Sequence, residues 1–147
     1  EEVLRQSFDG SYFVDNAVRG EDGALHLSGE RTEVCQYYAF FCGIATPQSH
    51  EELFKTLVRD FGPERHQHNR HPEIDFANAF IVNYLRLDIL MRYGYRDAVL
   101  KNIRGYFLNM ARKTGTLWEN DGDYASCNHG FASHVIYWLD KLDKARM

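Results

Sequence analysis

One segment restricts the fold of this chain more than any other, namely residues 72–93. Its apolar residues recur at helical spacing but cover more than one face: Ile74, Ala77, Phe80, Ile81, Tyr84, Leu85, Leu87, Leu90 and Met91. A helix that is apolar on most sides is buried by its neighbours. The segments on either side, residues 49–61 and 97–113, each carry a single apolar stripe. Short connections between such helices favour antiparallel hairpins, in which inner helices are buried and outer helices contact water.

The apolar spacing predicts an all-α array of about five helices. Their approximate bounds are 31–42, 49–61, 72–93, 97–113 and 128–143. Gly43, Gly94 and Gly115 follow three of these segments, where glycine commonly ends a helix. Closed double-layer toroids contain more helices than this. We therefore expect residues 1–147 to form a single domain that is part of a larger array.

Several helix ends carry recognisable signals. Ser49 and Glu52 form a Ser-x-x-Glu pair, which predicts a capping box at the second helix. Ser126 is a candidate N-cap for the last helix. Glu33 lies at the start of the first helix, where the helix dipole favours an acid. In the last helix we expect five side chains to face inward: Phe131, Val135, Ile136, Trp138 and Leu139.

The region before residue 28 has a different pattern. Residues 1–7 have the pattern of a helix end, and Asp9 and Gly10 then signal a turn. Two short apolar pieces, residues 12–14 and 24–27, flank a run rich in glycine and acids. This arrangement favours a small hairpin or extended element over a helix.

Charge and composition exclude several classes of protein. The net charge is −4, so no basic surplus indicates nucleic acid or an anionic membrane as a partner. No apolar run is long enough to span a bilayer. The three cysteines are too few for a disulfide scaffold, and we expect free thiols. We expect a soluble protein without a leader peptide, and the chain looks cut from something longer, so its compartment stays open.

A histidine-rich stretch, residues 64–71, connects the second and third predicted helices. Three histidines within six positions are able to ligate a divalent metal, although their spacing matches no common zinc site. A solvated connector is the preferred interpretation. A loop on the rim of a cleft and a metal site are the alternatives.

The most informative segment is residues 114–131, which contains Trp118-Glu119 and then Asn128-His129. Glycosidases need two carboxyl groups that flank the scissile bond, and aromatic rings that hold the sugar. A glutamate beside a tryptophan matches half of such a site, and Asn128 and His129 are suited to donate to sugar hydroxyls. A capping loop with a buried tryptophan and surface acids explains the same residues equally well.

This segment resembles the bacterial α-L-rhamnosidases, a family of six-hairpin (α/α)6-barrel glycoside hydrolases. Their last barrel turns read Gly-Ala-Thr-Thr-aliphatic-Trp-Glu and later Ser-Phe-Asn-His-Tyr-Ala-Phe-Gly-Ser-Val. Residues 114–119 here read Thr-Gly-Thr-Leu-Trp-Glu, and residues 126–135 read Ser-Cys-Asn-His-Gly-Phe-Ala-Ser-His-Val. Both halves occur in the same order. The link between them is shorter than in the family, and Gly130 stands at an aromatic position.

The resemblance implies an all-α fold of antiparallel hairpins that forms the C-terminal part of an (α/α)6 toroid. It implies that Glu119 is the general base of an inverting hydrolysis and that Trp118, Asn128 and His129 bind the sugar. The general acid would lie outside this chain, so the isolated chain would be inactive.

The implied partner is a carbohydrate, with no nucleic acid, membrane, metal or cofactor. A periplasmic or secreted parent is compatible with the resemblance. Exposed inner helices would promote self-association. The alternative is a non-catalytic helical interaction or structural domain.

Overall fold

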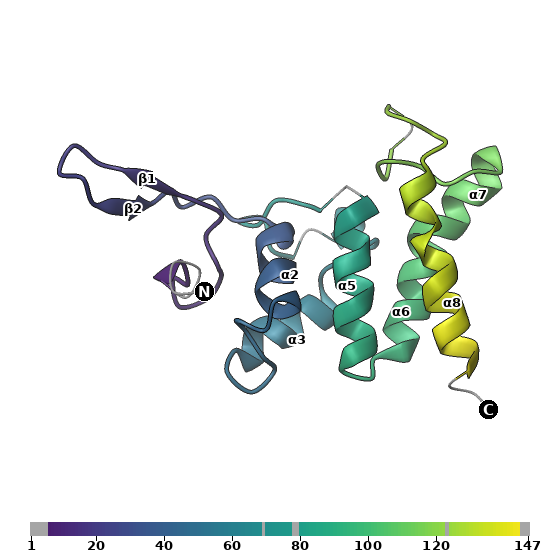
Figure 1. The fold of residues 1–147 in the computed structure, drawn as a ribbon, viewed down its shortest axis with the longest axis horizontal. Coiled ribbons are helices and arrows are strands. Elements are labelled where there is room, and N and C mark those ends of the chain that lie inside the picture. The colour runs from purple at the N-terminus through teal and green to yellow at the C-terminus, as the bar shows by residue number, and fades with distance from the viewer. Residues whose placement is uncertain (1–5, 69, 78–79, 123, 145–147) are drawn as a thin grey trace. The chain divides into compact units, whose positions relative to one another are not determined.

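The computed structural model describes residues 6–68, 70–77, 80–122 and 124–144. It is helix-rich and contains a small two-stranded antiparallel sheet (Figure 1). The chain divides into two compact units. Unit 1 comprises Glu1–Phe61 and Arg65–Ala77, and unit 2 comprises Gly62–Glu64 and Asn78–Met147. A helix-rich fold with a small sheet near the N-terminus confirms the coarse prediction from the sequence.

The sheet of unit 1 is a short hairpin. Its strands are β1 (Ala17–Arg19) and β2 (Leu25–Leu27), and Ala17 pairs with Leu27. The second predicted strand is confirmed, but the first lies later in the chain than residues 12–14. These earlier residues instead close a turn, because the Asp9 carboxylate accepts from the backbone N–H of Ser11 and Tyr12.

Unit 1 also contains the helices α2 (Glu33–Phe41), α3 (Glu51–Arg59) and α4 (Arg65–His68). Thr32 is the N-cap of α2, and its hydroxyl accepts from the Cys35 N–H at 3.2 Å. Gly43 has φ +74°, which confirms the predicted stop. The predicted capping box is wrong: Ser49 Oγ accepts from the Thr46 N–H at 3.0 Å, and α3 begins only at Glu51.

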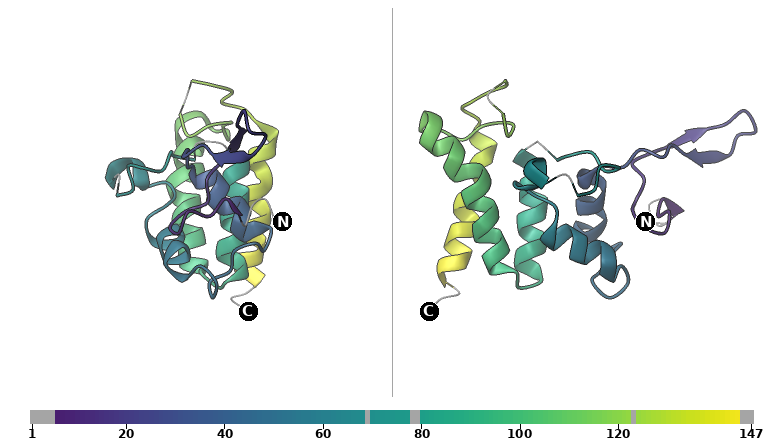
Figure 2. Two further views of the ribbon diagram at one scale, coloured as in Figure 1. Left: turned by 90° about the vertical axis from the view of Figure 1, so that its left-hand side faces the viewer. Right: turned by 180° about the vertical axis from the view of Figure 1, so that it is seen from behind.

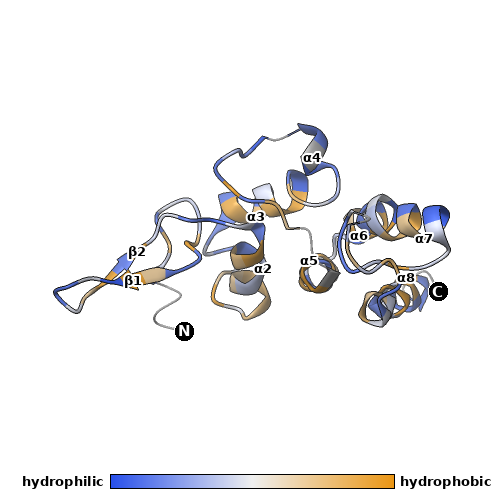
Figure 3. Ribbon diagram, turned by 90° about the horizontal axis from the view of Figure 1, so that it is seen from above, coloured by the Kyte–Doolittle hydropathy of each residue, from blue (hydrophilic) through white to orange (hydrophobic). Residues whose placement is uncertain are grey.

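The predicted helix 72–93 is shorter than expected. α5 runs from Phe80 to Arg92, while residues 72–77 belong to unit 1 and residues 78–79 lie outside the described residues. Before α5, the Asp75 N–H donates to the Arg31 carbonyl at 2.9 Å, and this pairing holds the segment extended. The buried character of α5 is confirmed, and Figure 3 shows hydrophobic residues around much of this helix. Its buried apolar residues are Val82, Leu85, Leu87, Ile89 and Leu90.

The helical run after α5 is interrupted by a π turn. It consists of α6 (Arg96–Ile103), a π segment (Arg104–Leu108) and α7 (Asn109–Thr114). Gly105 lies so close to Pro63 that a Cβ at position 105 would be 2.7 Å from the proline Cβ. Gly94 precedes the run and Gly115 ends it, and their positive φ values confirm the predicted helix stops. α5 and α6 therefore form an antiparallel hairpin (Figure 1).

The last helix also begins later than predicted. A 3-10 turn (Gly130–His134) precedes α8 (Val135–Lys144), which lies beside α6 in both Figure 1 and Figure 2. Ser126 is not its N-cap, since Ser126 Oγ donates to the Asn128 carbonyl at 3.3 Å. Val135 and Trp138 are buried as predicted, whereas Phe131, Ile136 and Leu139 are exposed. Within the described residues, no helix is long and apolar enough to cross a membrane.

Candidate functional site

The loop between α7 and the 3-10 turn carries the residues singled out from the sequence. Two backbone hydrogen bonds hold its arms together: the Glu119 N–H donates to the Ser126 carbonyl, and the His129 N–H donates to the Leu117 carbonyl, both at 2.8 Å. A further bond joins the Thr116 hydroxyl to the Cys127 carbonyl. The structure therefore brings the Trp-Glu and Asn-His segments side by side, although His129 comes ten positions after Glu119 in the sequence.

Trp118 anchors this loop rather than lining an open surface. Its side chain is 1% exposed, and Nε1 donates to Thr114 Oγ1 at 2.7 Å. The Lys113 ammonium lies 5.4 Å from the centre of the ring. Thr114 Oγ1 is also 2.7 Å from Thr116 Oγ1. A chain of hydrogen bonds therefore links the Trp118 side chain through the two threonines to the Cys127 carbonyl on the other arm of the loop. Any effect of Trp118 on a ligand would act through the position of Glu119.

The other three candidates are more accessible. Glu119 and His129 are half-buried, and Asn128 is exposed. Among the described residues, no side chain donates a hydrogen bond to the Glu119 carboxylate. A partly solvated carboxylate of this kind is able to accept a proton from water. The loop thus offers one carboxylate, one imidazole and one amide to a ligand.

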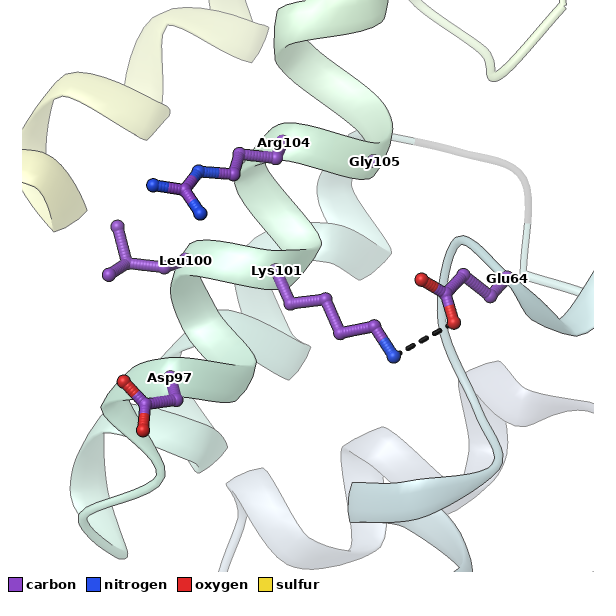
Figure 4. Close-up of a pocket in the computed structure, with 6 residues that line it drawn as sticks. All are labelled: Glu64, Asp97, Leu100, Lys101, Arg104 and Gly105. Atoms are coloured by element: carbon purple, nitrogen blue, oxygen red, sulfur yellow. Dashed lines mark ion pairs between the residues drawn. The ribbon is translucent and has the colours of Figure 1, made fainter.

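The pocket of unit 2 shown in Figure 4 lies elsewhere. It has a volume of about 530 Å³ and is lined by Glu64, Asp97, Leu100, Lys101, Arg104 and Gly105. Lys101 points toward Glu64 and pairs with it at 2.8 Å, whereas Arg104 points away from this pair. Neither Glu119 nor His129 lines the pocket. The sequence showed only a single apolar stripe over residues 97–113 and gave no signal for this pocket.

The histidine-rich stretch is only partly the solvated connector that we expected. Arg65 is buried, and its Nη1 pairs with Glu33 Oε1 at 2.6 Å. His71 is half-buried and contacts Asp60 and Tyr12. These contacts were not predicted from the sequence, because a polar stretch is typical of a solvated connector. Their partners Glu33 and Tyr12 are also far away in the sequence. No group of three potential ligands among the described residues is arranged to hold a metal ion.

The three cysteine side chains are free thiols. Cys35, Cys42 and Cys127 are all free, as predicted from their number and spacing. Burial raises the pKa of the Cys35 thiol to about 11, and nearby Asp15 adds to this effect. Cys35 therefore stays protonated at neutral pH, and a thiol is a much weaker nucleophile than a thiolate.

Comparison with known proteins finds no matching family model, and no curated protein or solved structure that matches the chain significantly. The resemblance to α-L-rhamnosidases therefore rests on the two motifs alone, and the assignment of catalytic roles stays a prediction.

Proposed function

We propose that this chain is the C-terminal part of the catalytic barrel of an inverting glycoside hydrolase similar to α-L-rhamnosidases. One observation carries the proposal, namely the backbone pairing that places Glu119 and His129 on adjoining arms of one loop. A half-site for sugar hydrolysis needs a carboxylate with hydrogen-bonding groups beside it. Helical hairpins that supply such a loop at their ends are the expected components of an (α/α)6 toroid.

In this proposal Glu119 is the general base that activates water. Asn128 and His129 hydrogen-bond the sugar hydroxyls, and the buried Trp118 side chain holds the loop in place. The general acid comes from another part of the barrel. An inverting mechanism leaves room for a water molecule, so the two carboxyl groups should stand about 6.5–9.5 Å apart. The product formed first should have the opposite anomeric configuration to the substrate, which proton NMR of the reaction mixture would detect.

The test is kinetic and uses the complete barrel with an aryl rhamnoside and other aryl glycosides. Glu119→Gln keeps the shape and removes the base, so kcat should fall by roughly 100-fold or more with little change in KM. His129→Ala removes a ligand contact, so KM should rise more than kcat falls. Glu21→Gln, which alters an exposed acid of the hairpin turn, is the control. A kcat for Glu119→Gln within a few-fold of wild type would remove Glu119 from the mechanism.

A second candidate function, a non-catalytic helical interaction domain, is favoured by the outer face of α8. Ile136 is 66% exposed and Leu139 is 43% exposed, on the same side of the helix. Large apolar side chains that are exposed on one face of a helix are compatible with a surface that is covered by a partner. Self-association, which light scattering over a concentration series measures, is expected of the isolated chain in both proposals. The two proposals differ in activity, because this alternative lacks activity in every context, whereas the glycosidase proposal requires activity in the complete barrel.

A further inference from the structure

Four side chains of unit 1 form a hydrogen-bonded chain centred on His71. His71 Nε2 lies 3.1 Å from Asp60 Oδ2, and His71 Nδ1 lies 3.0 Å from Tyr12 Oη. Tyr12 Oη in turn lies 3.0 Å from Glu73 Oε1. We call these four residues the His71 cluster. They come from the turn near the N-terminus, the C-terminal end of α3 and the stretch after α4, so the cluster fastens three separate pieces of backbone.

The number of hydrogens in the cluster identifies its charge state. Each of the three contacts needs one hydrogen between its two atoms. The Tyr12 phenol supplies one, and a neutral imidazole supplies only one more. With both carboxylates ionised, the third hydrogen is the second N–H of a charged imidazolium. With a neutral His71, one of the three contacts brings two lone pairs together.

The surroundings of the other three groups support this assignment. Burial raises the pKa of Tyr12 to about 12, helped by the hydrogen bond to Glu73, so the phenol keeps its proton. Burial alone would raise the pKa of Asp60, but hydrogen bonds from His71 and Arg70 outweigh it and lower this pKa. The Glu73 N–H and the Tyr12 hydroxyl lower the pKa of the Glu73 carboxyl against the effect of burial, and the nearby Arg65 guanidinium adds to this lowering. Both carboxylates are therefore ionised at neutral pH.

The charged groups around His71 are two carboxylates and two guanidinium groups. Arg70 Nη1 pairs with Asp60 Oδ1 at 2.9 Å, and His71 Nδ1 is 3.8 Å from the Glu73 carboxylate. Arg65 donates to the His71 carbonyl, but its own charge is matched by Glu33. Two carboxylates thus face Arg70 and the imidazole. The side chains of His71 and Asp60 are 19% and 14% exposed, so these charges are partly shielded from water.

We propose that the His71 cluster is a proton-dependent clasp, which fastens the turn around Tyr12 to the stretch after α4 while His71 carries two N–H groups. The closed clasp holds one more proton than the open one, so raising the pH weakens it. Lowering the pH through the depressed pKa values of Asp60 and Glu73 also weakens it, because it needs both carboxylates ionised. The turn around Tyr12 is consequently held most tightly at intermediate pH. This proposal does not depend on the proposed function.

The test uses NMR of the full chain labelled with 15N. It measures the protonation of the His71 ring and the protection of the turn around Tyr12 in the same sample. Ring-nitrogen shifts report how many nitrogens of His71 carry a proton. Hydrogen exchange of the Asp9 and Val14 amides reports the turn, since these amides donate to the Tyr12 and Ser7 carbonyls. We expect two protonated nitrogens where protection is greatest. As His71 loses a proton, we expect protection to fall about tenfold beyond the intrinsic effect of pH, as for one charge-assisted hydrogen bond.

Two variants separate the clasp from a merely structural contact. Tyr12→Phe keeps the ring and removes the hydroxyl, so the pH-dependent part of the protection should disappear. His68→Gln changes an exposed histidine of the same connector and should leave it unchanged. The proposal is overturned if His71 has a single protonated nitrogen while the turn is fully protected. It is also overturned if Tyr12→Phe lowers protection equally at every pH, or leaves its pH dependence as in the wild type.

Discussion

Each unit of the molecule buries an arginine, and the two units surround it differently. In unit 1, Arg65 pairs with Glu33 at 2.6 Å, donates to the carbonyls of His71 and Ile74, and has Phe61 and Phe76 within cation–π distance. In unit 2, Arg86 is 3% exposed, and its Nε donates to Asn102 Oδ1 at 2.8 Å.

The amides behind Arg86 extend this second network. Asn102 Nδ2 donates to Asn83 Oδ1 at 3.2 Å, which links α5 to α6. A carboxylate beside a buried guanidinium cancels its charge, whereas an amide offers only a dipole. Removing one partner of a buried ion pair leaves an uncompensated charge, but removing one amide leaves an unsatisfied donor. The two units should therefore respond differently to loss of the group that faces the arginine.

The largest expected effect is in unit 1. Glu33→Gln keeps the shape of the side chain but removes its charge, so Arg65 is left buried without a counter-charge. We expect the free energy of unfolding of unit 1 to fall by about 3–5 kcal/mol. Hydrogen exchange of the α2 amides in increasing urea measures this change. The paired variant Glu33→Leu with Arg65→Met should recover most of it. A loss below about 1 kcal/mol for Glu33→Gln would show that the pair is not electrostatically important.

A smaller effect is expected in unit 2. Asn102→Ala removes the acceptor of Arg86 and the donor to Asn83, at a cost of about 1–3 kcal/mol in the free energy of unfolding. Asn102→Asp sharpens the comparison, because it places a carboxylate at the position that faces Arg86, as Glu33 faces Arg65. Asn102→Asp should therefore destabilise α6 less than Asn102→Ala does, again measured by hydrogen exchange. If the two variants are equally destabilising, the charge of Arg86 is already compensated by its other contacts.

The smallest effect concerns the backbone that lies against Arg86. Gly62 has φ +104°, and a Cβ there would be 2.9 Å from Arg86 Nε. Gly62→Ala therefore adds crowding to backbone strain. Gly94→Ala is the matched control in the same unit, since Gly94 has φ +82° with open space around it. We expect Gly62→Ala to exceed the control by about 1 kcal/mol, by the usual cost of overpacking. Equal thermal unfolding midpoints for the two variants would mean that Arg86 moves aside.

The sequence predicted what is local and missed what is distant. Helical stripes and glycine stops located most helices to within a few residues, because periodicity and backbone conformation depend on near neighbours. The capping box failed for a local reason: the hydroxyl of Ser49 is already engaged by Thr46, and α3 begins only at Glu51. The partner of Arg65 was not readable, since Glu33 is 32 positions away and its place at a helix start had a sufficient explanation.

The candidate site shows the same limit. Glu119, Asn128 and His129 were found because they form a local pattern, and the loop does bring them close together. The burial of Trp118 was one of two interpretations that the sequence left open, and the structure supports an anchoring role. The His71 cluster gave no usable signal. Its members lie in three segments, and only the fold of unit 1 brings them together.

The π segment at Arg104–Leu108 sets the rotational phase of everything that follows it in the helix. A π turn contains one residue more than the α turn it replaces, and each residue of a helix advances the side chains by about 100°. Deleting one residue here, to restore a plain helix, would turn α7 by about that angle relative to α6. The loop that begins at Gly115 would leave the helix in another direction. The direction in which the chain runs toward Glu119 is thus set by the π segment, which lies before α7 in the chain.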